Sequence, residues 1–223
     1  MIDGKAMSAL TGTTTAAITL STNVGGDRIY VHAIMEGDGF SNAISGISDA
    51  QGATWTRNRG FPYQPNTYQH DDWVSSVTTG ALSADTITIS YSGSPYITQA
   101  YAVAVAGALT TTGFDPNSAI PATTSSECCG NATISTTYST TKGRDIIMNF
   151  EAEENSVNVP TISGYNQLFP PVAWPNNFTK TYFMVSYGFS SVPLTNATAT
   201  YTFQGGLGNF GSMTTIAVPA SGQ

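Results

Sequence analysis

Apolar and polar side chains alternate along most of this chain, in short runs that are separated by turn residues. The clearest run is Asp85–Gly93, in which isoleucine and tyrosine alternate with threonine and serine. Successive side chains of a strand point to opposite faces, so this period of two predicts strands with one face on a core. Similar runs occur at Ala17–Leu20, Asp27–Glu36, Gln99–Ala106, Ala132–Tyr138, Asp145–Ala152, Thr181–Phe189, Ala197–Phe203 and Ser212–Val218. About a dozen short strands and no helix predict an all-β fold, an antiparallel β-sandwich of jelly-roll type.

The length of the chain and the even spacing of its turns predict a single domain. All-β domains of about 200–250 residues are common, and no low-complexity linker or run of charge divides these 223 residues. No internal repeat is evident at the periods of solenoids or propellers. We therefore expect one β-sandwich over residues 21–223, preceded by a separate N-terminal segment, residues 1–20.

The chain is poor in charge. Charged residues make up 9% of it, with 7 Lys and Arg against 14 Asp and Glu. Since about a quarter of an average soluble domain is charged, hydroxyl and amide groups must hydrate this surface, and we expect an extracellular or cell-surface protein. The net charge of −7 argues against nucleic acid and membrane surfaces as partners. The start of the chain lacks the apolar stretch of a signal peptide, so a leader, if there was one, is expected to have been removed.

The two cysteines, Cys128 and Cys129, are adjacent. Consecutive Cα atoms lie about 3.8 Å apart, which is shorter than the separation in ordinary disulfides. The pair is therefore expected to be either a strained vicinal disulfide or two free thiols. The spacing of zinc ligands is absent.

Three acceptor motifs for N-glycosylation occur, at Asn131, Asn177 and Asn196. Each lies at an expected loop or strand edge, where a glycan would fit. Glycans at these sites would help to keep a surface with so few charges soluble.

Glu151, Glu153 and Glu154 form the densest acidic cluster. Glu151 and Glu153 share a strand face, and crowded carboxylates repel one another unless a cation or a proton intervenes. A Ca²⁺ site is physically sensible here if Glu36, Asp38 or backbone carbonyls converge on the cluster, and the alternative is a solvated strand end; we expect no other cofactor. Paired carboxylates could also serve glycoside hydrolysis, but no nucleophile elbow, zinc-protease motif or phosphate loop is present, so we expect no catalytic residues and no enzyme.

Histidine occurs at His32 and in the sequence His70-Asp71-Asp72. Adjacent strand residues face opposite ways, so His70 and Asp72 share a face and Asp71 does not. A lone strand histidine is more often packed or exposed than catalytic, and we predict no site at these residues.

The first half of the chain resembles a known extracellular module. The segments concerned are DRIYVHAI, SGISDAQGATWTRN, an aromatic strand around Trp73, DTITISYSG, AYAVAVAGA and FDPN, within residues 15–117. They are similar to a β-sandwich module of secreted bacterial and archaeal proteins, in which an Asp-x-x-Gly-x-x-Trp/Phe-Thr turn and a Thr-Ile-Thr-Val-x-Tyr-Ser-Gly strand recur. The resemblance implies a β-sandwich with no general catalytic activity.

The composition, rich in threonine and poor in lysine, resembles that of subunits of archaeal thread and bundling-pilus filaments. This resemblance implies a homopolymer in which each subunit donates an N-terminal strand to the next. We therefore expect a structural subunit of an extracellular filament, with Ala6–Leu20 as the donor segment and with Leu10, Ile18 and Leu20 filling pockets of the neighbour. The alternatives are a carbohydrate-binding or adhesin module that stacks aromatic rings on glycans, and a viral capsid or appendage protein.

Overall fold

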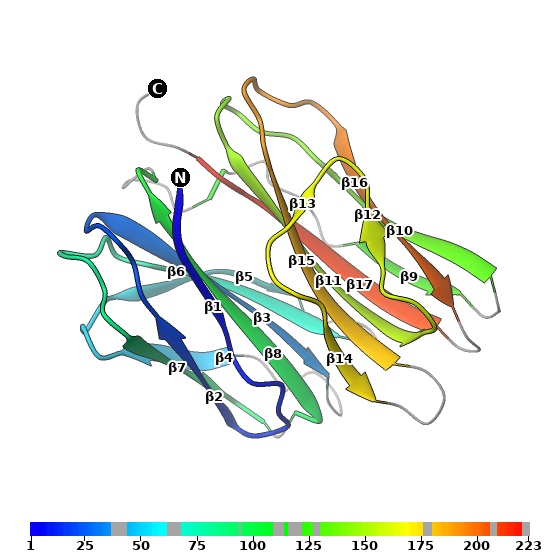
Figure 1. Ribbon diagram of the computed structural model, residues 1–223, viewed down its shortest axis with the longest axis horizontal. Coiled ribbons are helices and arrows are strands. Elements are labelled where there is room, and N and C mark those ends of the chain that lie inside the picture. The colour runs from blue at the N-terminus through cyan, green and yellow to red at the C-terminus, as the bar shows by residue number, and fades with distance from the viewer. Residues whose placement is uncertain are drawn as a thin grey trace. The chain divides into compact units, whose positions relative to one another are not determined.

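The structure is a computed structural model of the chain (Figure 1). It describes residues 1–36, 44–61, 68–93, 95–108, 114–115, 122–126, 130–175, 180–205 and 209–219. The chain divides into two compact units: unit 1 is Met1–Gly113 with Ala220–Gln223, and unit 2 is Phe114–Pro219. Two units thus take the place of the single domain expected over residues 21–223, and residues 1–20 belong to unit 1.

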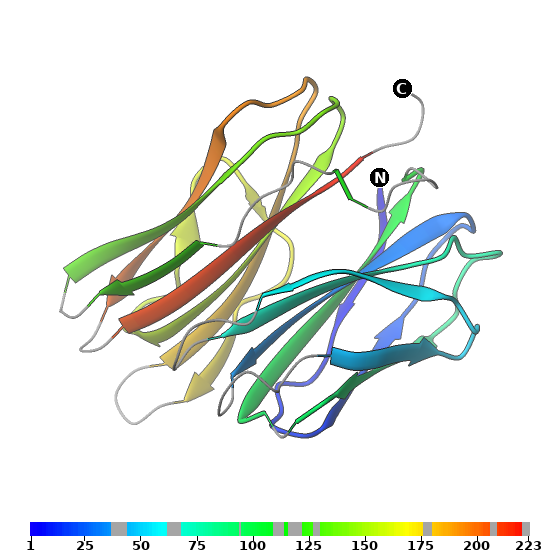
Figure 2. The ribbon, with the colours of Figure 1, turned by 180° about the vertical axis from the view of Figure 1, so that it is seen from behind.

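Within these ranges, all regular secondary structure is β-strand, which confirms the all-β fold. Unit 1 contains β1 (Ile2–Met7), β2 (Thr15–Leu20), β3 (Asp27–Glu36), β4 (Ile44–Asp49), β5 (Trp55–Phe61), β6 (Gln69–Ser75), β7 (Asp85–Tyr91) and β8 (Ile97–Ala106). Unit 2 contains β9 (Ala122–Ser126), β10 (Gly130–Tyr138), β11 (Ile146–Ser156), β12 (Thr161–Ile162), β13 (Asn166–Gln167), β14 (Val172–Pro175), β15 (Lys180–Phe189), β16 (Ala197–Gly205) and β17 (Asn209–Val218). The reverse view shows β17, in red, running along the length of its unit (Figure 2).

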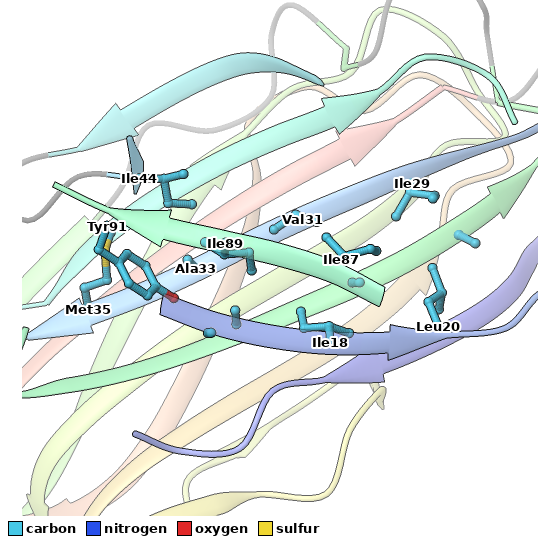
Figure 3. Packing of buried hydrophobic residues seen from close by; sticks show 14 of the residues in the cluster. Ile18, Leu20, Ile29, Val31, Ala33, Met35, Ile44, Ile87, Ile89 and Tyr91 are labelled. Carbon is cyan, nitrogen blue, oxygen red and sulfur yellow. The ribbon is translucent and has the colours of Figure 1, made fainter. Parts of the chain in front are cut away.

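Unit 1 is a β-sandwich of two antiparallel sheets, with strand orders β1-β8-β3-β6-β5 and β2-β7-β4. Exposed and buried residues alternate strictly along β2, so that Ala16, Ile18 and Leu20 face inward. Figure 3 shows Ile18 and Leu20 in the core cluster that also contains Ile29 and Ile87. Full burial of an aliphatic side chain of this size contributes about 1.5–3 kcal/mol, so the alternation seen in the sequence is what closes the sandwich.

The strands of unit 1 pair as one nested hairpin. β1 pairs with β8, β2 with β7 and β3 with β6, all antiparallel. Three further antiparallel pairings, β3 with β8, β4 with β7 and β5 with β6, complete the two sheets. The segment that forms unit 1 therefore folds back on itself about its own midpoint, and strands far apart in the sequence become neighbours.

Unit 2 repeats this plan. β9 pairs with β17, β10 with β16 and β11 with β15. The three further pairings also recur, as β11 with β17, β12 with β16 and β14 with β15. A core cluster with residues from β10, β11, β15, β16 and β17 fills the unit. The chain therefore contains a structural repeat that the sequence did not reveal.

The turns that follow β2 and β10 are built in the same way. The backbone N–H of Thr22 donates to the carbonyl of Leu82 (3.0 Å), and the N–H of Leu82 donates to the Thr22 hydroxyl (2.9 Å). In unit 2, Thr140 and Leu194 form the same two hydrogen bonds, at 2.9 and 3.0 Å. A threonine side chain replaces a missing backbone partner in both turns.

The repeat fixes which residues of the two units correspond. The carbonyl of Asp27 accepts a hydrogen bond from the N–H of Thr78 (2.8 Å), and the carbonyl of Asp145 accepts one from the N–H of Ser190 (3.0 Å). Asp27 begins β3, and Asp145 directly precedes β11. Within β3 and β11, residues at equal distances along the chain from these two aspartates are therefore equivalent.

The N-terminal strands pair within their own chain. β1 (Ile2–Met7) lies at a sheet edge against β8, and none of its residues is buried. Ile18 and Leu20 are fully buried in the core of unit 1, and Leu10 is half-buried in the connection between β1 and β2. In this single chain, two of the three residues expected to fill pockets of a neighbour thus fill the core of their own unit.

Candidate functional site

A row of polar side chains lies inside unit 2, along the centre of β11. Asn149, Glu151 and Glu153 alternate on one face of the strand, and all three are fully buried. The equivalent residues of β3 in unit 1 are Val31, Ala33 and Met35, which belong to its hydrophobic core. Unit 2 thus carries polar groups where unit 1 carries hydrocarbon, which makes this row the candidate functional site. 

The first member of the row is fully hydrogen bonded to its neighbours. Thr215 donates to Asn149 Oδ1 (2.7 Å), and Asn149 Nδ2 donates to Ser186 Oγ (3.2 Å). The hydroxyl of Thr136, on β10, shares a hydrogen bond with Thr215. This network joins β10, β11, β15 and β17. Such buried polar groups are stable because each has a partner.

The two glutamates differ from Asn149 in this respect. The four carboxyl oxygens of Glu151 and Glu153 have no hydrogen-bond partner among the residues that the structure describes. Gly211 lies opposite Glu153 in the β11–β17 ladder, and a Cβ atom at Gly211 would lie 2.2 Å from Glu153 Oε2. Glycine at this position therefore makes the room that the Glu153 carboxyl occupies.

Burial governs the protonation of both carboxyls. It raises the pKa of Glu151 well above its usual value, and it raises the pKa of Glu153 to about 10, with further contributions from the charges of Glu151 and Glu154. Burial also raises the pKa of Glu154, which is half-buried. Low-dielectric surroundings disfavour the charged form of a carboxyl, so burial makes both acids hold their protons more tightly than exposed carboxyls do.

The surroundings of the pair do not fit a calcium ion. Calcium takes six to eight oxygen ligands, but the residues opposite Glu151 in the flanking ladders are Met184 and Met213. Among the described residues, no group of three or more His, Cys, Asp and Glu side chains is placed to hold a metal ion. The expected triad thus places Glu151 opposite two methionine side chains, which present sulfur and hydrocarbon rather than the oxygen ligands of a calcium ion.

A second cluster lies in unit 1, where the sequence predicted no site. Antiparallel pairing of β3 with β6 sets His32 opposite Asp72. His32 Nδ1 is paired with Asp72 Oδ1, and His32 Nε2 lies 2.9 Å from His70 Nδ1. Arg57 Nε donates to Asp71 Oδ1 at 2.8 Å. Burial raises the pKa of Asp71, and Arg57 partly opposes that rise.

These side chains form a buried network. His32, His70, Asp71 and Asp72 are each at most 2% exposed, whereas Arg57 is 44% exposed at the edge of the cluster. A general base must come within hydrogen-bond reach of its substrate, and these imidazoles are covered. The cluster is best explained as a set of buried, hydrogen-bonded polar side chains that joins β3, β6 and β5.

A polar pocket of about 180 Å³ lies at one end of unit 1, lined in part by Asp49, Gln51, Thr78 and Asp85. Its carboxylates hold the turn between β4 and β5. Asp49 accepts hydrogen bonds from Trp55 Nε1 (2.7 Å) and from the backbone of Ala53 (3.0 Å). The Asp-x-x-Gly-x-x-Trp pattern noted in the sequence is therefore a structural turn.

The remaining predicted sites are only partly described. Cys128, Cys129 and Asn177 lie outside the described residues, and the backbone of Asn131 lies in β10. Asn196 is exposed at the turn before β16, with φ at 50°, and its equivalent in unit 1 is Ala84, with φ at 53°. Exposure at such a turn is compatible with the predicted glycan, since asparagine tolerates the left-handed region.

A glycan-binding module would stack sugars on exposed aromatic rings, for which Tyr68, Trp73 and Trp174 are candidates. Tyr68 is buried, Trp73 packs against the core of unit 1, and Trp174 is 37% exposed on β14 in unit 2. Stacking on a sugar needs exposed ring faces. These three rings therefore give no support to a glycan-binding row.

Comparison of the chain with protein-family models and with curated proteins gave no match. Within the described residues, no helix is long and apolar enough to cross a membrane.

Proposed function

We propose that this protein is a structural subunit of an extracellular surface filament. The support comes from the buried polar side chains: histidines, aspartates and threonines form hydrogen bonds that join neighbouring strands. Both units are built from long ladders, and the low charge of the chain suits a surface wetted by hydroxyl groups. The nested pairing in each unit also supports a jelly-roll plan.

The edge position of β1 is the observation that carries this proposal. β1 is the first strand of the chain, pairs only with β8 among the described strands, and has no buried residue. It can leave without opening the core, whereas removal of β2 would expose Ile18 and Leu20. Exchange of Ile2–Met7 onto β8 of a second copy would remake the same ladder between subunits, as in donor-strand complementation. The donor is therefore proposed to be β1, a shorter segment than Ala6–Leu20.

A disulfide between β1 and β8 tests this mechanism. Lys5 lies opposite Val103, so the variant K5C/V103C, with Cys128 and Cys129 replaced by serine, can lock β1 to its own unit. We expect fibres from the serine background and from the reduced variant in electron microscopy, and only single subunits from the oxidised variant. Fibres from a fully oxidised, intramolecularly linked sample would refute strand exchange, and the absence of fibres in every sample would refute the filament.

The repeated plan of the two units favours a viral capsid or appendage subunit as a second candidate. Jelly rolls are frequent in capsid domains, and this chain contains two units with the same nested pairing. The same microscopy separates the candidates, because closed shells or particles of fixed size would favour the capsid protein over the filament.

A further inference from the structure

We propose that Glu151 and Glu153 form a neutral carboxylic acid pair that keeps unit 2 closed in acidic surroundings and loosens it as the medium becomes alkaline. The pair would make acid the condition in which this protein is most stable. This inference concerns the interior of unit 2 and does not depend on how the protein assembles.

The geometry leaves these carboxyls two ways to exist. Both side chains are fully buried, and none of their four oxygens has a hydrogen-bond partner in the described part of the chain. An isolated buried carboxylate is far more costly than a buried neutral acid, unless a cation pairs with it. Either a proton or a cation must therefore neutralise each group.

The groups that face the pair favour the proton. The residues opposite Glu151 are Met184 on β15 and Met213 on β17, and those opposite Glu153 are Tyr182 and Gly211. β16 contributes Tyr201, whose own pKa is raised by burial and by the charge of Glu151. β10 contributes Ile134, Thr136 and Tyr138, of which Tyr138 also has a raised pKa. Among the described residues, the titratable groups facing the pair are thus tyrosines, and the charges that raise the pKa of Glu153 are those of Glu151 and Glu154.

Unit 1 shows what this position holds when no acid is present. The equivalents of Glu151 and Glu153 are Ala33 and Met35, which are both buried in the core of unit 1. The shared fold therefore does not require carboxyl groups here. Acids at these two positions give unit 2 a property that hydrocarbon lacks, which is that the core can gain or lose a proton.

The direction of the effect follows from linkage. A carboxyl whose pKa is higher in the folded than in the unfolded state binds its proton more tightly when folded. Its stabilisation is complete below the unfolded value and is lost as the pH rises toward the folded value. For Glu153, this window runs from its ordinary value of 4.5 to about 10. Unit 2 should thus lose stability steadily from weakly acidic to alkaline pH.

The experiment measures urea unfolding of the whole protein at several pH values from acidic to alkaline, with circular dichroism as the signal. We expect the unfolding midpoint of the wild type to fall as the pH rises, and the variant E151A/E153M, which carries the residues of unit 1, to lose most of this dependence. E151Q/E153Q is a second variant of nearly unchanged shape, and it should lose the dependence to the same extent as E151A/E153M. D3N is the control, because Asp3 is an acid whose pKa is lowered, chiefly by a hydrogen bond from Asn23, and its replacement should leave the downward trend in place.

Three results would overturn the proposal. A wild-type midpoint that rises from acidic to alkaline pH contradicts it, and so does an unchanged trend in E151Q/E153Q. If both variants fail to fold, infrared spectroscopy of the wild type at neutral pH decides, because the carbonyl band of a protonated carboxylic acid must be present. Stabilisation of the wild type by calcium at neutral pH, lost in E151Q/E153Q, would instead show a cation at the pair.

Discussion

Replacement of Leu20 by alanine tests whether β2 belongs to the core of its own unit. Leu20 is fully buried in the unit 1 cluster. Truncating a buried leucine to alanine costs about 2–5 kcal/mol, because transfer energy is lost and a cavity remains. For a unit of about 100 residues, each kcal/mol lowers the melting temperature by about 4–8 °C, so a fall of at least about 8 °C is expected for unit 1.

Tryptophan fluorescence can follow unit 1 by itself. Trp55 and Trp73 both pack against the cluster that contains Leu20, and the third tryptophan, Trp174, lies in unit 2 and can be changed to phenylalanine in every sample. T19A is the matched control, because Thr19 is the exposed neighbour of Leu20 on β2 and should change stability by less than about 0.5 kcal/mol. The reasoning is refuted if L20A behaves like T19A.

Two further predictions concern buried acids. Asp72→Asn removes the carboxyl that is paired with His32 inside unit 1, and loss of a buried hydrogen-bonding partner should lower the free energy of unfolding by about 1–3 kcal/mol; a loss below about 1 kcal/mol in urea unfolding would contradict the network. Burial, assisted by Asp3 and Asp115 respectively, raises the pKa of Asp27 and of Asp145 to about 6, so stability should fall between about pH 4 and pH 6. Asn at either position should flatten this part of the pH curve, and a steeper curve in calorimetry would count against it.

The strands were predictable because their alternation is a direct record of burial. Asp27–Glu36 was predicted as a strand and has these bounds in the structure, and the run from Asp85 onward forms β7 to Tyr91. The number of units was not predictable in this way, since alternation reports that a residue faces a core but not which core. Nothing in the period of two distinguishes one long sandwich from two shorter ones.

The repeat was present in the sequence in another form. Ser21-Thr22 and Ser139-Thr140 each follow a strand, and each is followed by glycine and then by the aspartate that opens the next strand. The repeat spacing is more than twice the period of a solenoid or propeller repeat, and the signal lies in turn residues rather than in strands. Comparison of the chain with itself at that spacing would have found it.

The two buried clusters depended on information that local pattern does not contain. His32 and Asp72 meet only because β3 and β6 pair in one particular register, and register is set by the whole sheet. Glu151 and Glu153 looked like a solvated face because the other face of their strand carries Met148 and Phe150. The structure buries both faces of β11. In such a strand, a charged residue does not indicate which face is exposed to water.

The turn that occurs in both units allows the two halves of this chain to be compared with each other. The strands that share the nested pairing have counterparts in the other half, so the molecule carries its own reference for judging which side chains this framework requires. Threonine at the turn and aspartate at the next strand are common to both copies. They mark what the architecture itself requires, whereas interior positions that differ between the halves are free to be shaped by what each half must do.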